Sequence, residues 1–195
     1  MTDERSTPVD TPLKGRTILM SSGSRGIGLS ILAAAARAGA NAVILAKTDE
    51  PGPRLPGTVH TAAAAVGAAG GTAVGVVGDV RQEADVEREV ATAADRFGGI
   101  GICVNNASAI DLRGTEDLSV KRFDLMQQIN TRGTFLLTRA CVPHLKRSDH
   151  AHVLTLSPPL NLAPHWLGAH PAYTVAKCGM TLLTLVGRPS TRNAA

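Results

Sequence analysis

The stretch that decides the fold is Arg16-Thr-Ile-Leu-Met-Ser-Ser-Gly-Ser-Arg-Gly-Ile-Gly28. Its first residues form a short apolar run with strand character, and its last residues form a turn of small side chains. An Ala-rich helical segment follows from about Ile27 to Ala38, and Gly39 is placed to cap its end. A second strand-like run covers Ala42 to Ala46. Strand, glycine turn, helix and strand make a βαβ unit, whose crossover should be right-handed.

The rest of the chain continues the alternation of strands and helices. Strand-like runs occupy residues 72–77, 100–104 and 152–157, and helical patterns occupy residues 61–69, 82–97, 118–146 and 172–186. Gly133 and Pro143 interrupt the third of these helical patterns, and in the second Asp85 and Glu89 form charge pairs beside Arg88 and Arg96. This alternation predicts an α/β fold, a doubly wound Rossmann-like parallel sheet of about five strands flanked by helices.

The organisation suggests one domain between two polar ends. We expect a flexible tail over residues 1–14, a dinucleotide-binding Rossmann domain over residues 15–187, and a frayed C-terminus over residues 188–195. Residues 47–60 contain three prolines and two glycines, so they predict an irregular connection rather than a regular helix or a central strand.

Composition excludes several classes of function. The formal charge is +4, but the basic residues are dispersed and only 3% of residues are aromatic, so we expect no nucleic-acid partner. No apolar run is long enough to span a bilayer, and the N-terminus lacks the apolar stretch of a signal peptide. The three cysteines, Cys103, Cys141 and Cys178, form no CxxC pair, so we expect no disulfide framework and no metal site. A reducing cytoplasm is the simplest compartment.

Tyr173 and Lys177 lie four residues apart in the last helical segment, which places both on one helix face. An ammonium held beside a phenol stabilises the phenolate and makes the phenol a usable proton donor or acceptor. Such a pair also occurs by chance on surface helices. Together with the glycine turn, it indicates a hydride-transfer enzyme.

The glycine turn lets backbone N–H groups and a helix N-terminus approach a pyrophosphate. Its spacing, Gly23-x-x-Gly26-x-Gly28, differs from the G-x-G-x-x-G pattern, and a tight turn without a ligand is the alternative. No carboxylate stands at the end of the second strand, where Lys47 is found instead. Lys47 and Arg25 could pair with a 2′-phosphate, which favours NADP(H) over NAD(H), unless both are ordinary surface cations.

Five motifs stand in an order that resembles the short-chain dehydrogenase/reductase family. They are the turn from Gly23 to Gly28, Asp79-Val80, Asn105-Asn106-Ala107, Asn130, and the pair Tyr173 and Lys177. The resemblance covers about Lys14 to Val186. Residues 46–48, the proline-rich stretch to Thr61, and residues 105–110, 130–134 and 157–162 look like the hydroxysteroid-dehydrogenase-like branch.

The resemblance implies a role for each matching residue. Tyr173 would exchange the proton with the reacting carbonyl or alcohol, Lys177 would hold the nicotinamide ribose, and Asn130 would support a proton relay through a water. Asp79 and Val80 would flank the adenine, and Asn106 and Ala107 would line the inner ribose. The predicted catalytic set is Tyr173, Lys177, Asn130 and Ser157, and no metal ligand is predicted. The predicted cofactor-binding set is Ser22, Gly23, Ser24, Arg25, Gly26, Ile27, Gly28, Lys47, Asp79, Val80, Asn106, Ala107 and Lys177.

Three departures from the family pattern bear on the site. Ser22 replaces the first glycine, and a side chain there costs backbone energy if the position needs positive φ. Proline follows Ser157 at the place of the usual catalytic serine, so Ser157 or Asn161 would have to polarise the carbonyl. The family's last two strands and its substrate-covering loop are also missing after the helix of Tyr173 and Lys177.

The third departure should leave the fifth strand as a sheet edge. It should also expose part of the apolar face of the last helix, which carries Val175, Met180, Leu182, Leu183 and Leu185. A partner chain could cover this face, and the resemblance implies a homo-oligomer that pairs through its long helices.

These observations predict an NADP(H)-dependent oxidoreductase acting on the alcohol or carbonyl group of an apolar small molecule. Trp166, Leu160, Leu162 and Leu167 are expected near the mouth of its pocket. The alternative is a truncated, non-catalytic NADP-binding module or an inactive fragment.

Overall fold

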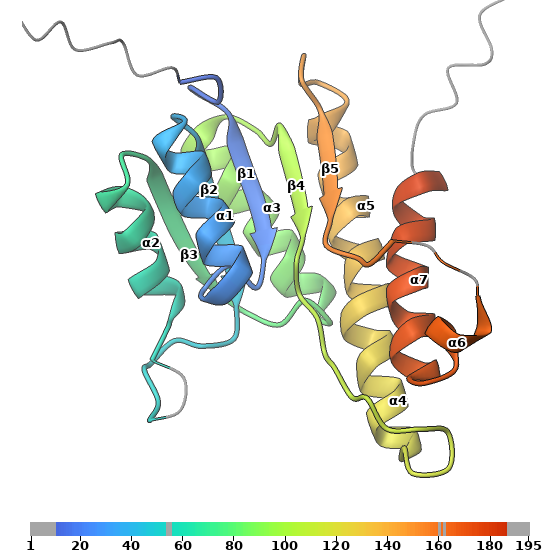
Figure 1. Ribbon diagram of the computed structural model, residues 1–195. Coiled ribbons are helices and arrows are strands. Elements are labelled where there is room, and N and C mark those ends of the chain that lie inside the picture. The colour runs from blue at the N-terminus through green and yellow to red at the C-terminus, as the bar shows by residue number, and fades with distance from the viewer. Residues whose placement is uncertain (1–10, 54–55, 160, 162, 187–195) are drawn as a thin grey trace, which may run out of the picture.

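A parallel sheet of five strands forms the centre of the molecule (Figure 1). The computed structural model describes residues 11–53, 56–159, 161 and 163–186. The strands are β1 (Thr17–Ser21), β2 (Asn41–Ala46), β3 (Thr72–Val77), β4 (Ile102–Asn105) and β5 (His152–Thr155). Their order across the sheet is β3-β2-β1-β4-β5, and all neighbouring pairs are parallel. The predicted doubly wound α/β fold is therefore confirmed.

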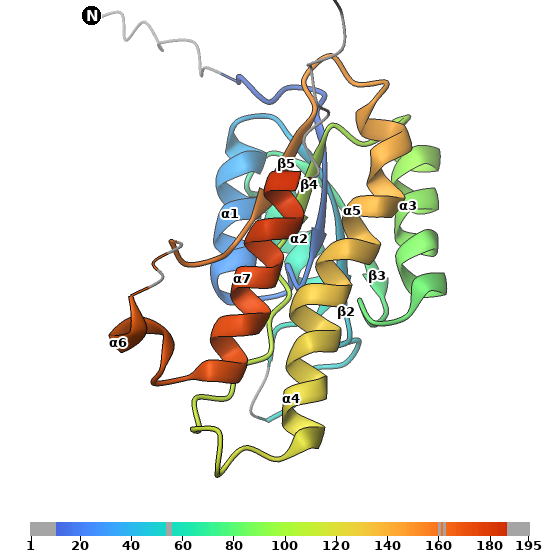
Figure 2. The ribbon, with the colours of Figure 1, turned by 90° about the vertical axis from the view of Figure 1, so that its right-hand side faces the viewer.

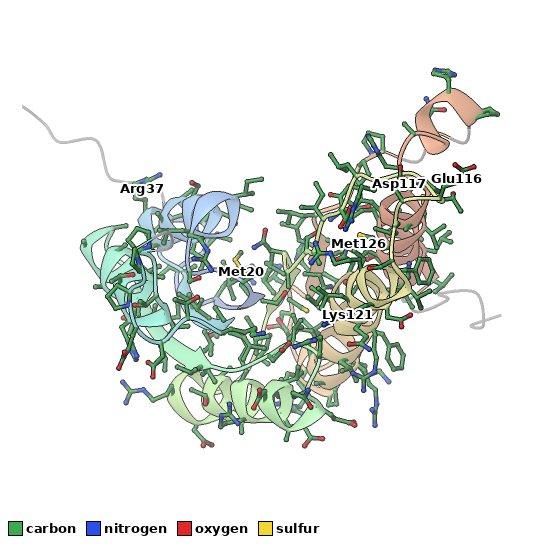
Figure 3. All side chains as sticks on the ribbon, turned by 90° about the horizontal axis from the view of Figure 1, so that it is seen from below. Met20, Arg37, Glu116, Asp117, Lys121 and Met126 are labelled. Carbon is green, nitrogen blue, oxygen red and sulfur yellow. The ribbon has the colours of Figure 1, made fainter. Side chains whose placement is uncertain are left out.

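The carboxyl ends of the central strands meet at one edge of the sheet. Ser21 at the end of β1 lies opposite both Leu45 of β2 and Asn105 of β4. The chain connections turn outward in opposite directions from β1 and β4, so a crevice for a ligand is expected between these strands. Figure 3 looks onto this edge from below, with Met20 of β1 near the middle and Met126 to its right.

Helices cover both faces of the sheet (Figure 2). Helices α1 (Gly26–Arg37) and α2 (Val59–Ala68) pack on one face, and α3 (Glu83–Phe97) and α5 (Gly133–Leu145) pack on the other. Because the central strands are covered on both sides, β1 is buried throughout, and β2 from Ala42 onward. Gly39 follows α1 with φ of +92°, as expected of a glycine after a helix end.

The predicted long helical pattern forms one continuous run with a π-helical segment inside it. Helix α4 (Val120–Met126) continues into the π-helical segment η1 (Gln127–Arg132) and then into α5. Pro143 lies within α5 without ending it. The sequence pattern predicted an interruption at Gly133, whereas the π-helical segment lies just before this residue. π-Helical segments frequently occur at functional sites.

Strand β5 is the last strand of the sheet, as expected, and it is followed by α6 (Pro164–Leu167) and α7 (Pro171–Val186). On α7, Val175, Leu182 and Leu185 are exposed, whereas Met180 is buried. The predicted loss of packing is thus real for part of this face but does not extend to Met180. No helix in the described part of the chain has the length and apolar character needed to cross a membrane.

Residues 11–14, expected to belong to the loose tail, lie against the end of α1. The Leu13 N–H donates to the Ala38 carbonyl at 2.9 Å, and Leu13 packs against the core. The remainder of the predicted tail, the predicted frayed end from residue 188, Leu160 and Leu162 lie outside the described residues, as do the side chains of Trp166 and Leu167.

Glu89 corrects the predicted pattern of charge pairs on α3. Asp85 and Arg88 do form an ion pair at 2.9 Å, but the Glu89 side chain is fully buried in the core beside Cys103 and Cys141. Neither Glu89 carboxylate oxygen has a hydrogen-bond partner among the described residues. Burial raises the Glu89 pKa well above its usual range, and the neighbouring Cys103 adds a smaller effect in the same direction. The backbone N–H of Leu45 opposes this shift without reaching hydrogen-bond geometry.

Candidate functional site

The turn after β1 is built so that backbone can come close to backbone. Ser22 has φ of +60°, so this side chain occupies the left-handed region that favours glycine. A Cβ on Gly23 would lie 2.7 Å from Leu32 Cδ1, and a Cβ on Gly28 would lie 2.7 Å from the Ser22 oxygen. Gly23 and Gly28 therefore allow a packing that other residues would block. The Gly26 φ is +53°, and the Ile27 side chain is exposed at the start of α1.

Hydrogen bonds join this turn to the segment after β4. The Ser21 hydroxyl accepts from the N–H groups of Asn106 at 3.2 Å and Ala107 at 3.1 Å. The Asn106 amide Nδ2 donates to the Ser22 oxygen at 2.7 Å. The structure thus brings the predicted residues Asn106 and Ala107 against the glycine turn. Ser21 was missed by the sequence interpretation, although its place at the end of an apolar strand was a signal.

The glycine turn carries two buried polar groups that fit a phosphorylated ligand. Ser24 Oγ and Arg25 Nη1 are buried and have no hydrogen-bond partner among the described residues. Arg25 Nη2 donates to Thr48 Oγ1 at 3.2 Å, which places the Arg25 guanidinium at the end of β2. Unsatisfied buried donors next to a helix N-terminus are suited to receive phosphate oxygens.

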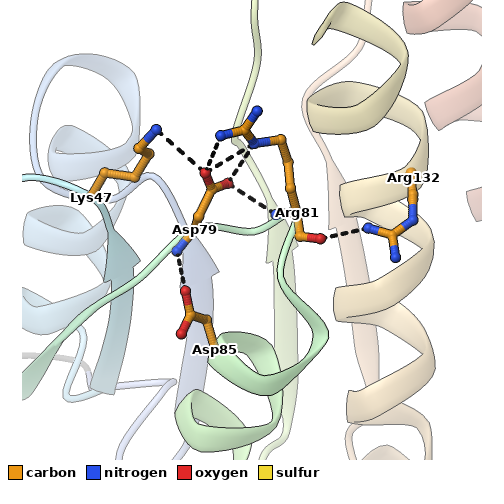
Figure 4. Close-up of polar contacts among 5 residues, drawn as sticks. All are labelled: Lys47, Asp79, Arg81, Asp85 and Arg132. Atoms are coloured by element: carbon orange, nitrogen blue, oxygen red, sulfur yellow. Dashed lines mark hydrogen bonds and ion pairs between the residues drawn. The ribbon is translucent and has the colours of Figure 1, made fainter. Parts of the chain in front are cut away.

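Lys47 and Arg81 both bind the Asp79 carboxylate after β3 (Figure 4). Lys47 Nζ lies 3.3 Å from Asp79 Oδ2, and Arg81 Nε donates to both carboxylate oxygens at 2.9 and 3.0 Å. Burial raises the Asp79 pKa, but the hydrogen bonds from Arg81 outweigh this effect and the pKa falls to about 2. Lys47 is therefore paired with the Asp79 carboxylate. Val80, the residue after Asp79, is buried. The sequence signal for the missed Arg81 was its place two residues after Asp79.

Asn130 fixes the segment after β4 on the other side of the crevice. This buried residue lies in η1, and its Nδ2 donates to the Ala109 oxygen at 3.0 Å. The Ala109 N–H donates in return to Asn130 Oδ1 at 2.7 Å. Ala109 packs in the same cluster as Tyr173, together with Met126 of α4. Asn130 thus holds the backbone of a residue that packs on the same cluster as Tyr173.

Lys177 connects α7 to the end of β5. Its Nζ donates to the Leu156 oxygen at 2.6 Å, and burial lowers the pKa of its ammonium group. Thr131 Oγ1 donates to the Ala176 oxygen at 3.2 Å, which ties α7 to η1 beside Asn130. A Cβ on Gly179 would lie 2.9 Å from Thr131 Cγ2, so the two helical segments are in close contact. Tyr173, Lys177 and Asn130 therefore belong to one packed unit at the carboxyl edge.

The side chains of Ser157 and Asn161 both form hydrogen bonds with other groups of the protein. Ser157 Oγ donates to the Lys177 oxygen at 2.9 Å and accepts from Thr181 Oγ1 at 2.6 Å. Asn161 Oδ1 accepts from the Ala163 N–H at 3.0 Å. Because its proton is committed to the α7 backbone, Ser157 acts in this structure as a link between β5 and α7. Its catalytic role stays a prediction.

The arrangement first defines a class of protein. A doubly wound parallel sheet with a tight glycine turn at its switch point is the architecture of a dinucleotide-binding domain. The phenol and ammonium of α7 lie at the same edge of the sheet as this turn. The class defined by this arrangement is a dinucleotide-binding α/β domain with a tyrosine and a lysine at its ligand-binding edge.

Comparison with known proteins gives the family. A family model described as short chain dehydrogenase matches residues 16–191. Hydroxysteroid dehydrogenase-like protein 2 of Xenopus laevis is 53% identical over 173 residues, which are 89% of this chain and 42% of that protein. The Homo sapiens protein of the same name is 51% identical, over 89% of this chain and 41% of its own length. The chain belongs to the short-chain dehydrogenase/reductase family.

Solved structures agree with this assignment. A Xanthomonas campestris protein matches with a TM-score of 0.87 and 55% identity, over 90% of this chain and 66% of its own. A short chain dehydrogenase from Mycobacterium thermoresistibile matches with a TM-score of 0.84 and 51% identity, over 87% and 60%. The chain thus spans less than half of the curated relatives and less than two thirds of these two structures. The family fold implies a nicotinamide cofactor, and the unsatisfied donors of the glycine turn fit such a group.

Proposed function

We propose that this protein is an NADP(H)-dependent oxidoreductase that acts on the alcohol or carbonyl group of an apolar small molecule. The observation that carries the proposal is the convergence of two units on one sheet edge. Asn106 and Ala107 are bonded to the end of β1 and the glycine turn. Ala109, three residues after Asn106, is held by Asn130 and packs on the same apolar cluster as Tyr173. One short segment thereby links the dinucleotide side to the cluster on which the proton-exchanging phenol packs.

In the proposed reaction, the bound nicotinamide supplies or accepts the hydride. The Tyr173 hydroxyl donates its proton to the carbonyl oxygen during reduction and takes it back during oxidation. Lys177 places a positive charge one helical turn from this phenol and stabilises the phenolate that remains. Asn130 fixes the Ala109 backbone, and Ala109 packs on the same cluster as Tyr173. Asp79, Val80, Asn106, Ala107 and the residues of the glycine turn would hold the dinucleotide.

A wild-type experiment tests both halves of the proposal. We expect NADPH to bind in a fluorescence titration and to be consumed with apolar ketones or aldehydes. The apolar surroundings of Tyr173, which include Leu118 and Met126, support this substrate class. A rate that is equal or higher with charged carbonyl compounds would contradict the substrate assignment. No binding of NADPH or NADH would contradict the whole proposal.

The preference for NADP(H) rests on Arg25, whose guanidinium lies at the end of β2, and on Lys47, which follows β2 in place of an acidic residue. We expect the double variant Arg25→Ala/Lys47→Ala to bind NADPH about 10- to 100-fold more weakly, because charge-assisted hydrogen bonds to the 2′-phosphate are lost. NADH affinity should stay within about twofold, since that cofactor lacks this phosphate group. Titration of both cofactors measures the change.

The control for this prediction is Arg37→Ala. Arg37 is exposed in the last turn of α1, at the opposite end of that helix from the glycine turn. Its removal should leave both affinities unchanged. An equal loss for NADPH and NADH in the double variant would sink the assignment of the 2′-phosphate.

We also propose that two copies pair through their long helices. The support is an apolar hollow of about 270 Å³ on α4 and α7, lined by Leu118, Val120, Phe123, Ala172 and Val175, among others. Val120 and Val175 are 75% and 56% exposed, and large exposed apolar side chains mark association surfaces.

Phe123→Glu is therefore expected to shift the protein towards monomer in sedimentation velocity, because a charge would be buried in the apolar contact. Lys121→Glu, on the same helix at an exposed position, serves as the control and should leave the oligomer in place. An unchanged sedimentation coefficient for Phe123→Glu would exclude this face as the interface.

The second candidate function is a non-catalytic NADP-binding module. It is favoured by the open edge of β5 and by the hollow beside it, which Thr155, Ser157, Pro158, Thr181 and Leu185 line with others. NADPH binding without turnover that depends on Tyr173 would identify the module.

A reducing, cytoplasmic setting is also part of our proposal, and the three free thiols Cys103, Cys141 and Cys178 support it.

A further inference from the structure

The turn after β3 is attached to the helical run that carries Asn130. Arg132 Nη1 donates to the Arg81 backbone oxygen at 2.5 Å across 51 positions of sequence (Figure 4). The next residue, Gly133, makes a second contact: a Cβ there would lie 3.0 and 3.1 Å from the two methyl carbons of Val80. A hydrogen bond and a close approach therefore dock this turn onto the junction of η1 and α5.

Side-chain hydrogen bonds also hold the turn together internally. The Asp79 carboxylate accepts from the N–H and the guanidinium of Arg81, and the Asp79 N–H donates to Asp85 Oδ2 at 2.8 Å. These bonds fix Asp79 relative to Arg81 and to the start of α3. The Arg132 contact is the one that fixes the Arg81 backbone relative to η1.

The strand order says which part of a dinucleotide faces this turn. The β1-β2-β3 half of a doubly wound sheet receives the adenosine, and the far side of the switch point receives the other nucleoside. Asp79 and Val80 follow β3, whereas Tyr173 and Lys177 lie on the β4-β5 side. Asn130 and Arg132 are two residues apart in η1: Arg132 reaches the turn after β3, and Asn130 reaches the segment after β4.

We propose that Arg132 is a positioning residue for the adenosine half of the cofactor. It acts through the Arg81 carbonyl and keeps Asp79 and Val80 in register with the segment after β4 that Asn130 holds. The role is specific to one half of the ligand, because Arg132 contacts the turn after β3 and Asn130 contacts the segment after β4. This inference rests on the proposed dinucleotide-binding function.

The experiment compares ligands that contain one half of the cofactor. In Arg132→Ala, binding of NADPH and of 2′,5′-ADP, measured by calorimetry, should weaken about tenfold, because a hydrogen bond from a charged donor is lost. Binding of reduced nicotinamide mononucleotide, which lacks the adenosine, should be unchanged. Arg132→Lys, which keeps a cationic donor, should recover most of the affinity.

Arg139→Ala is the matched control. Arg139 is also an exposed arginine on the same helical run, and its Nη1 pairs with Glu83 of α3 at 2.7 Å. It should leave all three affinities unchanged. Equal weakening for the adenosine and nicotinamide ligands in Arg132→Ala, or no weakening at all, would overturn the inference while leaving the proposed function intact. A wild-type protein that binds none of the three ligands would overturn both.

Discussion

Replacing Tyr173 by Phe is expected to lower turnover by about 10²- to 10⁴-fold, the usual contribution of a positioned general acid or base. The substitution removes only the hydroxyl, so the packing of the ring against the cluster of Met126, Ala172 and Ala176 should persist. NADPH affinity should therefore stay within about twofold of wild type, since no cofactor-binding contact is removed. Steady-state rates with an apolar ketone, together with an NADPH titration, measure the two quantities separately.

Lys177→Met extends the same test. It removes the ammonium that bonds to the Leu156 oxygen and stands one turn from Tyr173, so turnover should again fall. Lys121→Met is the control, because Lys121 is exposed on α4 and should be dispensable. Full activity in Tyr173→Phe would refute the assignment of the proton donor, whatever Lys177→Met does.

Replacing Glu89 by Gln is expected to change how stability depends on pH. In the folded protein the Glu89 pKa is raised by burial, so the folded state keeps a proton that the unfolded chain releases above its ordinary pKa. The stability contribution is fully present below that ordinary value and is lost as the pH rises towards the folded pKa. Between pH 5 and 8 the wild type should lose up to about 1.4 kcal/mol per pH unit relative to Glu89→Gln.

Urea unfolding at several pH values gives the free energy of unfolding needed for this comparison. Taking the difference between variant and wild type removes the opposing effect of His144, whose lowered pKa makes stability rise with pH over part of this range. Glu89→Leu, which places an apolar side chain in the core, should show the same pH dependence as Glu89→Gln. Glu87→Gln on the exposed side of α3 is the control. A constant difference across the pH range would show that Glu89 does not stay protonated in the fold.

Most of the fold could be predicted because it is encoded in local patterns. The apolar runs that became β1 to β5 are near-continuous or bounded by turn residues, and the helices between them leave few topologies open. Ser22 is a second local success: its backbone does adopt the positive φ that the missing glycine implied. The spacing of Tyr173 and Lys177 likewise follows from helix geometry, and both lie on α7.

The details of the site could not be predicted because they depend on neighbours that are distant in sequence. Lys47 joins Asp79 and Arg81 because β2 and β3 are in register. Ser157 is linked to α7 because that helix returns alongside β5. Nothing in the local pattern around residues 47 or 157 specifies these partners.

The sequence by itself determined the alternation of strands and helices, the glycine turn and the positions that resemble a known family. Each of these patterns lies within a stretch of sequence shorter than one helix or strand with its turn. Only the tertiary structure decided that Glu89 is buried instead of paired and that Arg132 reaches the turn after β3. Those outcomes depend on the rotation of α3 about its axis and on how α5, which continues η1, packs beside α3. Both are set by the packing of the whole core, where burial of apolar surface outweighs the preference of any single charged side chain.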